Sequence, residues 1–172
     1  MARRVSDRLD RLPSANVVVL RDVLASDLDV FYENQLDAQA NWMAAFTAKD
    51  PADRAAFDAH WNRILADTER VIIKTVLVNG RVAGSVLAYA WGGEWEVSYW
   101  LGRSYWGRGI ATRALTAFLE LFHVRPLAGR AAKDNLASIR VLEKCGFVPG
   151  GEARGFANAR GAEIDEVILI LK

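Results

Sequence analysis

Hydrophobic and polar residues follow two periods along the chain, a short one typical of strands and a longer one typical of helices. Runs rich in β-branched and aromatic residues predict strands at 16–21, 71–78, 81–89 and 94–101. Asn79-Gly80 joins the second run to the third and is a strong signal for a two-residue hairpin turn. Gly92-Gly93 joins the third run to the fourth, so three consecutive strands connected by tight turns are expected.

Apolar residues at spacings of three and four predict four helices. The first follows Ser26, the second enters at Asp50-Pro51, the third runs from Gly109 to Phe122, and the fourth is capped by Asp134 or Asn135 and ends at Gly146. Further strands are expected at 126–133, from 147 onward and at 166–171. The order βααβββαβαββ predicts an α+β domain with a mixed sheet flanked by helices.

Composition and charge agree with one folded domain and exclude several other classes. With 172 residues and 52% apolar residues, we expect a single domain over 14–172 preceded by a flexible arm, residues 1–13. The formal net charge of +1 gives no general electrostatic reason to expect a nucleic-acid partner. One cysteine, Cys145, excludes a disulfide framework and indicates a reducing cytoplasm. We expect neither a signal peptide nor a membrane span.

Gly107 and Gly109, between a predicted strand and a predicted helix, form the most informative segment of the chain. Glycines permit a tight turn, and the first-turn amides of the following helix carry partial positive charge. Such a turn binds phosphate groups, although a helix also begins with glycines for purely structural reasons. A Walker loop is excluded because Ile110 follows Gly109 where that loop has lysine, and the third glycine of a dinucleotide-binding fold is absent.

Two motifs carry a resemblance to a known family. Trp106-Gly107-Arg108-Gly109-Ile110-Ala111 is similar to the acyl-CoA pyrophosphate loop of the GNAT N-acetyltransferase superfamily. Residues 134–147, DNLASIRVLEKCGF, resemble the second signature of that superfamily. The residues of both motifs are most similar to those of the RimJ/RimL-like branch of ribosomal-protein alanine acetyltransferases. The resemblance implies a mostly antiparallel sheet with splayed central parallel strands, and acetyl-CoA as the acetyl donor.

The resemblance also implies which residues contact acetyl-CoA. Backbone groups of residues 99–101 would hold pantetheine and polarise the thioester carbonyl, and the amides of residues 107–112 would hold pyrophosphate. Trp106 replaces the usual Gln or Arg, and Asn135 would anchor pantetheine, cap its helix, or do both. The implied contact residues are Tyr99, Trp100, Leu101, Trp106, Gly107, Arg108, Gly109, Ile110, Ala111, Thr112, Asn135 and Ser138.

Proton transfer is assigned to two side chains. Glu96 lies thirteen residues before Gly109, where many members of the family place the carboxylate that takes the amine proton through water. The alternatives are Glu94, two residues earlier on the same strand face, and water acting without a carboxylate. Leu142 replaces a tyrosine that many members use to protonate the thiolate. Ser138 is therefore the candidate acid, and its alternative is a plain helix serine.

The acceptor is left open by the sequence. Trp42, Tyr89, Trp91 and Glu94 are the candidate acceptor contacts, because the family forms that site from the first helices and the strand before the turn. An α-amine with a pKa of about 8 is roughly a tenth neutral at pH 7, whereas lysine is neutral in less than about one part in a thousand. A modest base therefore favours an α-amine.

The leading hypothesis is transfer of an acetyl group from acetyl-CoA to a protein N-terminal amine. One alternative acceptor is a small-molecule amine such as an antibiotic, polyamine or amino acid. Another alternative is an acyl-CoA-binding regulatory domain that has lost catalysis. This alternative follows from Leu142, which stands in place of the tyrosine that many members use as an acid. We expect no metal, no nucleic acid and no membrane partner. A homodimer is compatible with this branch, although no segment specifies one.

Overall fold

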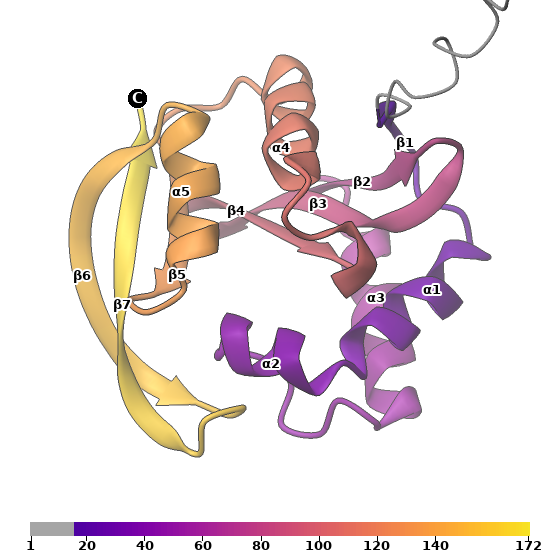
Figure 1. Cartoon of the computed structure of the whole chain (residues 1–172), viewed down its shortest axis with the longest axis horizontal. Coiled ribbons are helices and arrows are strands. Elements are labelled where there is room, and N and C mark those ends of the chain that lie inside the picture. Colours follow the sequence, from indigo (N-terminus) through magenta and orange to yellow (C-terminus); the bar gives the residue numbers. More distant parts are fainter. Residues whose placement is uncertain (1–15) are drawn as a thin grey trace, which may run out of the picture.

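The computed structural model describes residues 16–172, which form one seven-stranded sheet with helices packed against it (Figure 1). The arm predicted at residues 1–13 lies outside the described residues. The strands are β1 (Val18–Arg21), β2 (Val71–Val78), β3 (Arg81–Trp91), β4 (Glu94–Leu101), β5 (Leu127–Ala132), β6 (Val148–Ala157) and β7 (Ala162–Leu171). Their order is β1-β2-β3-β4-β5-β7-β6, and within the described residues only the β4–β5 pair is parallel.

The helices confirm the mixed α+β fold and add one element to the predicted order. They are α1 (Asp27–Gln35), α2 (Ala38–Ala44), α3 (Arg54–Ala66), α4 (Ile110–Leu121) and α5 (Leu136–Lys144), with a 3-10 turn, η1, at Arg103–Tyr105. The order βααβββαβαββ omits α2, whose seven residues are too few for an apolar stripe to repeat. None of the helices in residues 16–172 has the length and hydrophobicity needed to cross a bilayer.

Local signals predicted the hairpin turn and three of the helix starts. Asn79 and Gly80 both have positive φ, 50° and 78°, as the predicted hairpin turn requires. Helix α1 follows Ser26 as predicted, although the Ser26 side chain makes no cap, and the starts after Gly109 and Asn135 are confirmed. The start of α3 lies after Asp53, whose side chain accepts a hydrogen bond from the Ala56 amide at 2.9 Å. Pro51 therefore belongs to the preceding turn instead of the helix.

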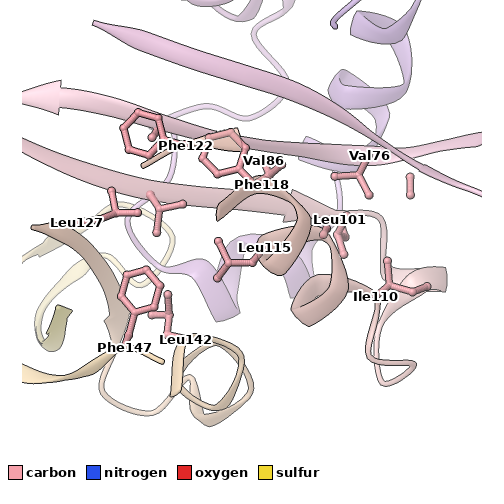
Figure 2. Close-up of a cluster of buried hydrophobic side chains, with 14 of the residues drawn as sticks. Val76, Val86, Leu101, Ile110, Leu115, Phe118, Phe122, Leu127, Leu142 and Phe147 are labelled. Carbon is pink, nitrogen blue, oxygen red and sulfur yellow. The ribbon is translucent and has the colours of Figure 1, made fainter. Parts of the chain in front are cut away.

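Helices cover both faces of the sheet. On one face, α4 buries Leu115 and Phe118 in the main core together with residues of α5 and the central strands (Figure 2). On the other face, Phe31 of α1 packs with Phe57 and Trp61 of α3. Burial of a side chain of this size stabilises the fold by about 1.5–3 kcal/mol. The predicted apolar stripe of α4 therefore fixes that helix, and its first turn, against the sheet.

The parallel pair β4–β5 separates shortly after it forms. Its register covers three residue pairs, from Trp95 with Leu127 to Val97 with Gly129. Beyond that point β4 continues beside β3, and β5 continues beside β7. The edges of β4 and β5 that face each other have no strand partner there, and this is the splayed pair that the resemblance implies.

Candidate active site

The turn between β4 and α4 has the backbone geometry of an anion site. Gly107 and Gly109 have φ of 68° and 70°, in the left-handed region that favours glycine. A Cβ atom at either position would meet no atom of the chain within 4 Å. Backbone conformation therefore requires the two glycines, and a phosphate group can approach the turn closely.

The first turn of α4 supplies hydrogen-bond donors for that anion. Gly109 is the N-cap residue, and no side chain caps the helix. The amide of Arg113 bonds back to the Gly109 carbonyl at 3.2 Å. The amides at 107–112 precede this first intrahelical bond and carry the partial positive charge of a helix N-terminus. Ile110 is buried in the core and holds this turn in place.

Two side chains implied as acyl-CoA contacts brace the turn. The Trp106 indole Nε1 donates to the Leu101 carbonyl at 3.0 Å, which ties the loop to the end of β4. The Arg108 guanidinium donates to Asn16 Oδ1 at 2.5 Å and to the Ser104 carbonyl at 3.3 Å. Since both side chains bond to the chain itself, the backbone of Arg108 is the part that contributes to the anion site.

The pantetheine contacts implied by the resemblance lie at the unpaired edge of β4. Leu101 is buried in the main core. Trp100 points to the opposite face, where its indole Nε1 donates to the Asn34 carbonyl at 3.3 Å. Tyr99 points toward α5. Alternate burial of these side chains fixes the strand, so its backbone groups keep one orientation toward β5.

Glu96 is the central member of a charged cluster whose residues come from the neighbouring strands β3, β4, β5 and β7. It is buried, with 7% of its surface exposed, on the face opposite to α4 and α5. Its Oε2 accepts a hydrogen bond from the Tyr89 hydroxyl at 2.9 Å, and its Oε1 accepts one from Arg130 Nε at 3.0 Å. Arg130 Nη1 also donates to Glu166 Oε1 at 3.0 Å. One guanidinium thus serves two carboxylates, and the cluster carries a net charge of −1 that suits proton acceptance from an ammonium ion.

Burial, together with the hydrogen bond to Glu96, raises the pKa of Tyr89 well above its ordinary value. Tyr89 therefore remains a neutral donor to Glu96 throughout the physiological range. Within the cluster, Tyr89 is the hydrogen-bond donor to Glu96, and this contact is separate from any contact that Tyr89 makes with an acceptor amine.

Asn135 and Ser138 lie at the start of α5. Asn135 Oδ1 accepts from the Ser138 amide at 3.1 Å, so Asn135 caps the helix, and its Nδ2 donates to the Met43 carbonyl at 3.0 Å. The Ser138 hydroxyl lies 2.8 Å from the Tyr99 hydroxyl. Burial raises the pKa of Tyr99 to about 12. A pair of hydroxyl groups therefore joins β4 to α5 beside the point where β4 and β5 separate.

The structure divides the four predicted acceptor residues between two places. Tyr89 belongs to the Glu96 cluster, and Trp42 lies on α2, whose end reaches Asn135. Trp91 and Glu94 instead face each other across the β3–β4 turn, and Trp91 is 77% exposed. That turn lies about 23 Å along β4 from its glycine-turn end, given ~3.3 Å per residue.

The helix α2 is held by an ion pair at its N-terminus and by a hydrogen bond and a cation–π contact near its C-terminus. Asp37, its N-cap, pairs with Arg103 of η1 at 3.0 Å. Arg160, in the β6–β7 turn, donates to the Trp42 carbonyl at 2.7 Å and stacks over the Trp42 ring at 4.3 Å. The same guanidinium pairs with Asp134 through two hydrogen bonds of 2.9 and 3.1 Å. These contacts tie α2 to η1 and to the start of α5.

Arg130, Glu166 and Arg160 were not predicted from the sequence. Arg130 had a weak signal, because it is the one charged residue in the strand LAGRAA and also the one exposed residue there. Glu166 and Arg160 are ordinary surface residues in sequence terms. Their partners come from strands and helices distant in the chain, so no local pattern indicates them.

Neither Leu142 nor Cys145 offers a reactive group toward the splayed strands. Leu142 is 1% exposed and packs on Gly129, where a Cβ atom would lie 2.6 Å from Leu142 Cδ2. Burial raises the pKa of the Cys145 thiol. Among residues 16–172, no group of three His, Cys, Asp or Glu side chains is placed to hold a metal ion.

A glycine turn at a helix N-terminus, a splayed parallel pair and a carboxylate on the leading strand together define an acyl-CoA-dependent acyltransferase fold. The family model of the acetyltransferase (GNAT) domain matches residues 18–148, and the chain belongs to this family. An uncharacterized N-acetyltransferase, p20 from Bacillus licheniformis, is 29% identical over 83 residues, which are 46% of this chain and 47% of that protein. The chain thus spans about half the length of that curated relative.

Solved structures share the fold over almost the whole described chain. RimJ from Mycobacterium smegmatis, in complex with CoA-disulfide, superimposes with a TM-score of 0.77 at 22% identity and covers 91% of this chain and 82% of its own. RimL, a ribosomal L7/L12 alpha-N-protein acetyltransferase solved with coenzyme A, gives a TM-score of 0.76 at 18% identity over 90% of this chain and 93% of its own. These likenesses establish the fold.

Proposed function

We propose that this chain transfers the acetyl group of acetyl-CoA to the α-amino group of a protein N-terminus. The observation that carries the proposal is the environment of Glu96, whose two oxygens already accept hydrogen bonds from Tyr89 and Arg130. An α-amine is roughly a tenth neutral at pH 7 and asks little of a single carboxylate, whereas lysine, neutral in less than about one part in a thousand, asks far more.

The remaining residues fit this reaction. The amides of the glycine turn hold the pyrophosphate, and the free edge of β4 holds pantetheine and polarises the thioester carbonyl. Glu96, through a water molecule, takes the proton from the ammonium form of the acceptor. The neutral amine then attacks the carbonyl carbon, and its nitrogen loses a second proton to solvent. The carbon–sulfur bond breaks, and Ser138 gives a proton to the departing sulfur and afterwards regains one.

Exposed apolar surface beside α2 favours a polypeptide over a polyamine. Trp42 is 53% exposed and Phe46 is 39% exposed. Arg103 and Arg160 flank α2 but pair with Asp37 and Asp134, so their charges are balanced. The fold of RimL, named for an α-amine of a ribosomal protein, agrees with this choice, although a spermidine N-acetyltransferase shares the fold as well.

Release of free thiol from acetyl-CoA tests the proposal directly. The purified chain is mixed with acetyl-CoA and three acceptor sets: peptides with a free N-terminus, the same peptides blocked at the N-terminus but containing lysine, and small amines including spermidine and amino acids. We expect thiol release with the free peptides and with neither of the other sets. Mass spectrometry of the peptides then locates the acetyl group.

Two results would contradict the proposal in different ways. Turnover of small amines without turnover of peptides would replace the acceptor and keep the chemistry. Tight binding of CoA without thiol release for any amine would support a regulatory acyl-CoA-binding domain instead.

A further inference from the structure

Position 142 in α5 lacks the hydroxyl group that the family resemblance leads one to expect there. Leu142 fills it with a fully buried apolar side chain that packs on Gly129 of β5. One helical turn earlier, on the same helix face, Ser138 presents a hydroxyl. The Tyr99 phenol reaches that hydroxyl from β4, so a tyrosine is present in this region but comes from a different element.

We propose that Tyr99 and Ser138 form one proton relay to the departing thiolate, with Ser138 in contact with the sulfur and Tyr99 behind it. This inference rests on the proposed acetyl transfer and deepens it, because it assigns the source of the proton.

The geometry supports a relay rather than two independent hydroxyl groups. The Tyr99 oxygen lies 2.8 Å from Ser138 Oγ and 3.2 Å from the Ser138 carbonyl oxygen. In the 2.8 Å bond either oxygen can donate, so the hydrogen bond can reverse without movement of heavy atoms. Because Asn135 bonds to the Ser138 amide, the first turn of α5 holds the serine in place.

The proton balance of the step is complete with the groups present. When the carbon–sulfur bond of the tetrahedral intermediate breaks, its electron pair goes to sulfur, and sulfur takes the proton of Ser138. Ser138 simultaneously takes the proton of Tyr99. The acceptor nitrogen, positively charged in the intermediate, loses its second proton to solvent, and the phenolate is reprotonated by the proton that Glu96 took from the ammonium form. No further reactant is required.

The surroundings of Tyr99 keep its phenol protonated. Burial raises the pKa of Tyr99 to about 12, so the phenol is protonated at neutral pH. The titratable group whose charge bears on Tyr99 is Cys145, at the end of α5. Burial raises the pKa of that thiol as well, so it remains neutral. Tyr99 and Cys145 are therefore both neutral at neutral pH, and Tyr99 keeps its proton.

The first test measures the thiol of bound CoA and needs no acceptor. Ultraviolet absorbance of the thiolate is followed against pH with CoA bound to the wild type, Tyr99→Phe, Ser138→Ala and the double variant. Donors that contact sulfur stabilise its thiolate, so we expect the bound thiol to titrate at lower pH in the wild type than in either single variant. The double variant should titrate like Ser138→Ala.

The second test uses the acceptor identified by thiol release. We expect Tyr99→Phe to lower kcat about 10–100-fold with KM for acetyl-CoA unchanged, since general acid catalysis contributes roughly 10²–10⁴-fold in total. Tyr99→Phe should have no further effect when Ser138 is already alanine. Tyr32→Phe is the matched control, because its hydroxyl donates to the Ala52 carbonyl at 2.7 Å on the other face of the sheet.

The two proposals fail in different ways. If the wild type releases no thiol with any amine, the proposed function fails, and the titration of bound CoA still decides whether the pair contacts sulfur. Identical titration curves for the wild type and Tyr99→Phe would overturn the relay. So would a Tyr99→Phe variant with lowered melting temperature and wild-type kcat, because the hydroxyl pair would then serve only to join β4 to α5.

Discussion

At the residue scale, the site is built by side chains that are already bonded to one another. Glu96 accepts hydrogen bonds from Tyr89 and Arg130. Both side-chain polar atoms of Asn135 form hydrogen bonds, and Arg108 donates to Asn16. Each group is therefore preorganised, and substrate binding costs little side-chain ordering. The same bonding limits what each group can do, so substitutions at these positions change catalysis more than binding.

Replacing Glu96 by glutamine tests its assignment as the base. We expect kcat/KM to fall about 100-fold or more, with no change in the Kd for CoA. Glu163→Gln is the control, because Glu163 pairs with Arg154 on the exposed surface. If Glu94→Gln slows the reaction and Glu96→Gln does not, the base is Glu94.

Asp27 gives a pH-dependent stability of known sign. It is buried and accepts hydrogen bonds from Arg21, Thr75 Oγ1 and the Leu24 amide, and these lower its pKa to about 2 against the opposing effect of burial. A depressed carboxyl pKa stabilises the fold above the unfolded value near 4, and that stability is lost as pH falls toward 2.

We therefore expect Asp27→Asn to lower the free energy of unfolding by about 2–3 kcal/mol at pH 7. Because the variant lacks the titrating carboxyl, its deficit relative to the wild type should shrink between about pH 4 and pH 2. Urea unfolding at several pH values measures both effects. A deficit that stays constant with pH would mean that the ion pair with Arg21 does not account for the stability.

At the element scale, the connection from β4 through η1 to α4 determines how acetyl-CoA is held. Trp106 ties the loop to the end of β4, and two glycines with positive φ turn the chain into the helix. The packing of α4 on the sheet then fixes the direction of its first-turn amides. Affinity for CoA should depend on the backbone shape of this segment more than on its charged side chains.

Gly109→Ala tests that dependence. An alanine at a φ of 70° costs about 1–2 kcal/mol. The turn of the variant relaxes when free and must regain this shape to bind, so we expect the Kd for CoA to rise roughly 5–30-fold by calorimetry. Gly80→Ala is the matched control, because Gly80 has a φ of 78° and equally open surroundings in the distant β2–β3 turn. It should lower the melting temperature and leave the Kd unchanged. Equal Kd values for both variants would argue against an anion site at Gly109.

Periodic segments and tight turns could be predicted from the sequence, whereas short or long-range features could not. The stripe of α4 repeats over three turns, and the Asn79-Gly80 turn has a backbone requirement that few residues satisfy. Seven-residue α2 has neither property, so it was missed. In the site, the glycine turn was visible locally. The bonds of Glu96 to Arg130 and of Ser138 to Tyr99 join residues 34 and 39 positions apart, and only the fold brings them together.

At the scale of the whole molecule, the C-terminal hairpin and the N-terminal helices meet on one side of the splayed strands. Buried Ala45, Ala132 and Ala157 join the end of α2 to β5 and β6. Arg160 adds its contacts with Trp42 and Asp134. The side that we propose for the acceptor is thus built from both ends of the described chain, while the proposed donor side is built from residues between β4 and α5.

Arg160→Ala tests this division. We expect KM for the acceptor to rise about 5–20-fold while KM for acetyl-CoA stays within about twofold, because loss of roughly 1–2 kcal/mol of contacts frees α2. Arg154→Ala on the same hairpin is the control, since Arg154 pairs only with exposed Asp165 and Glu163 among the described residues. Equal rises in both KM values would show that α2 supports the whole site.

The backbone construction of the glycine turn also has a consequence for evolution. Main-chain amides are the same in every amino acid except proline, so side chains at most positions of the turn are free to drift while its donors persist. A saturation library selected for CoA binding should therefore retain glycine at Gly107 and Gly109 and accept many different residues in place of Arg108. Lineages of this fold can in this way change their acceptor side extensively and still inherit the same acyl donor.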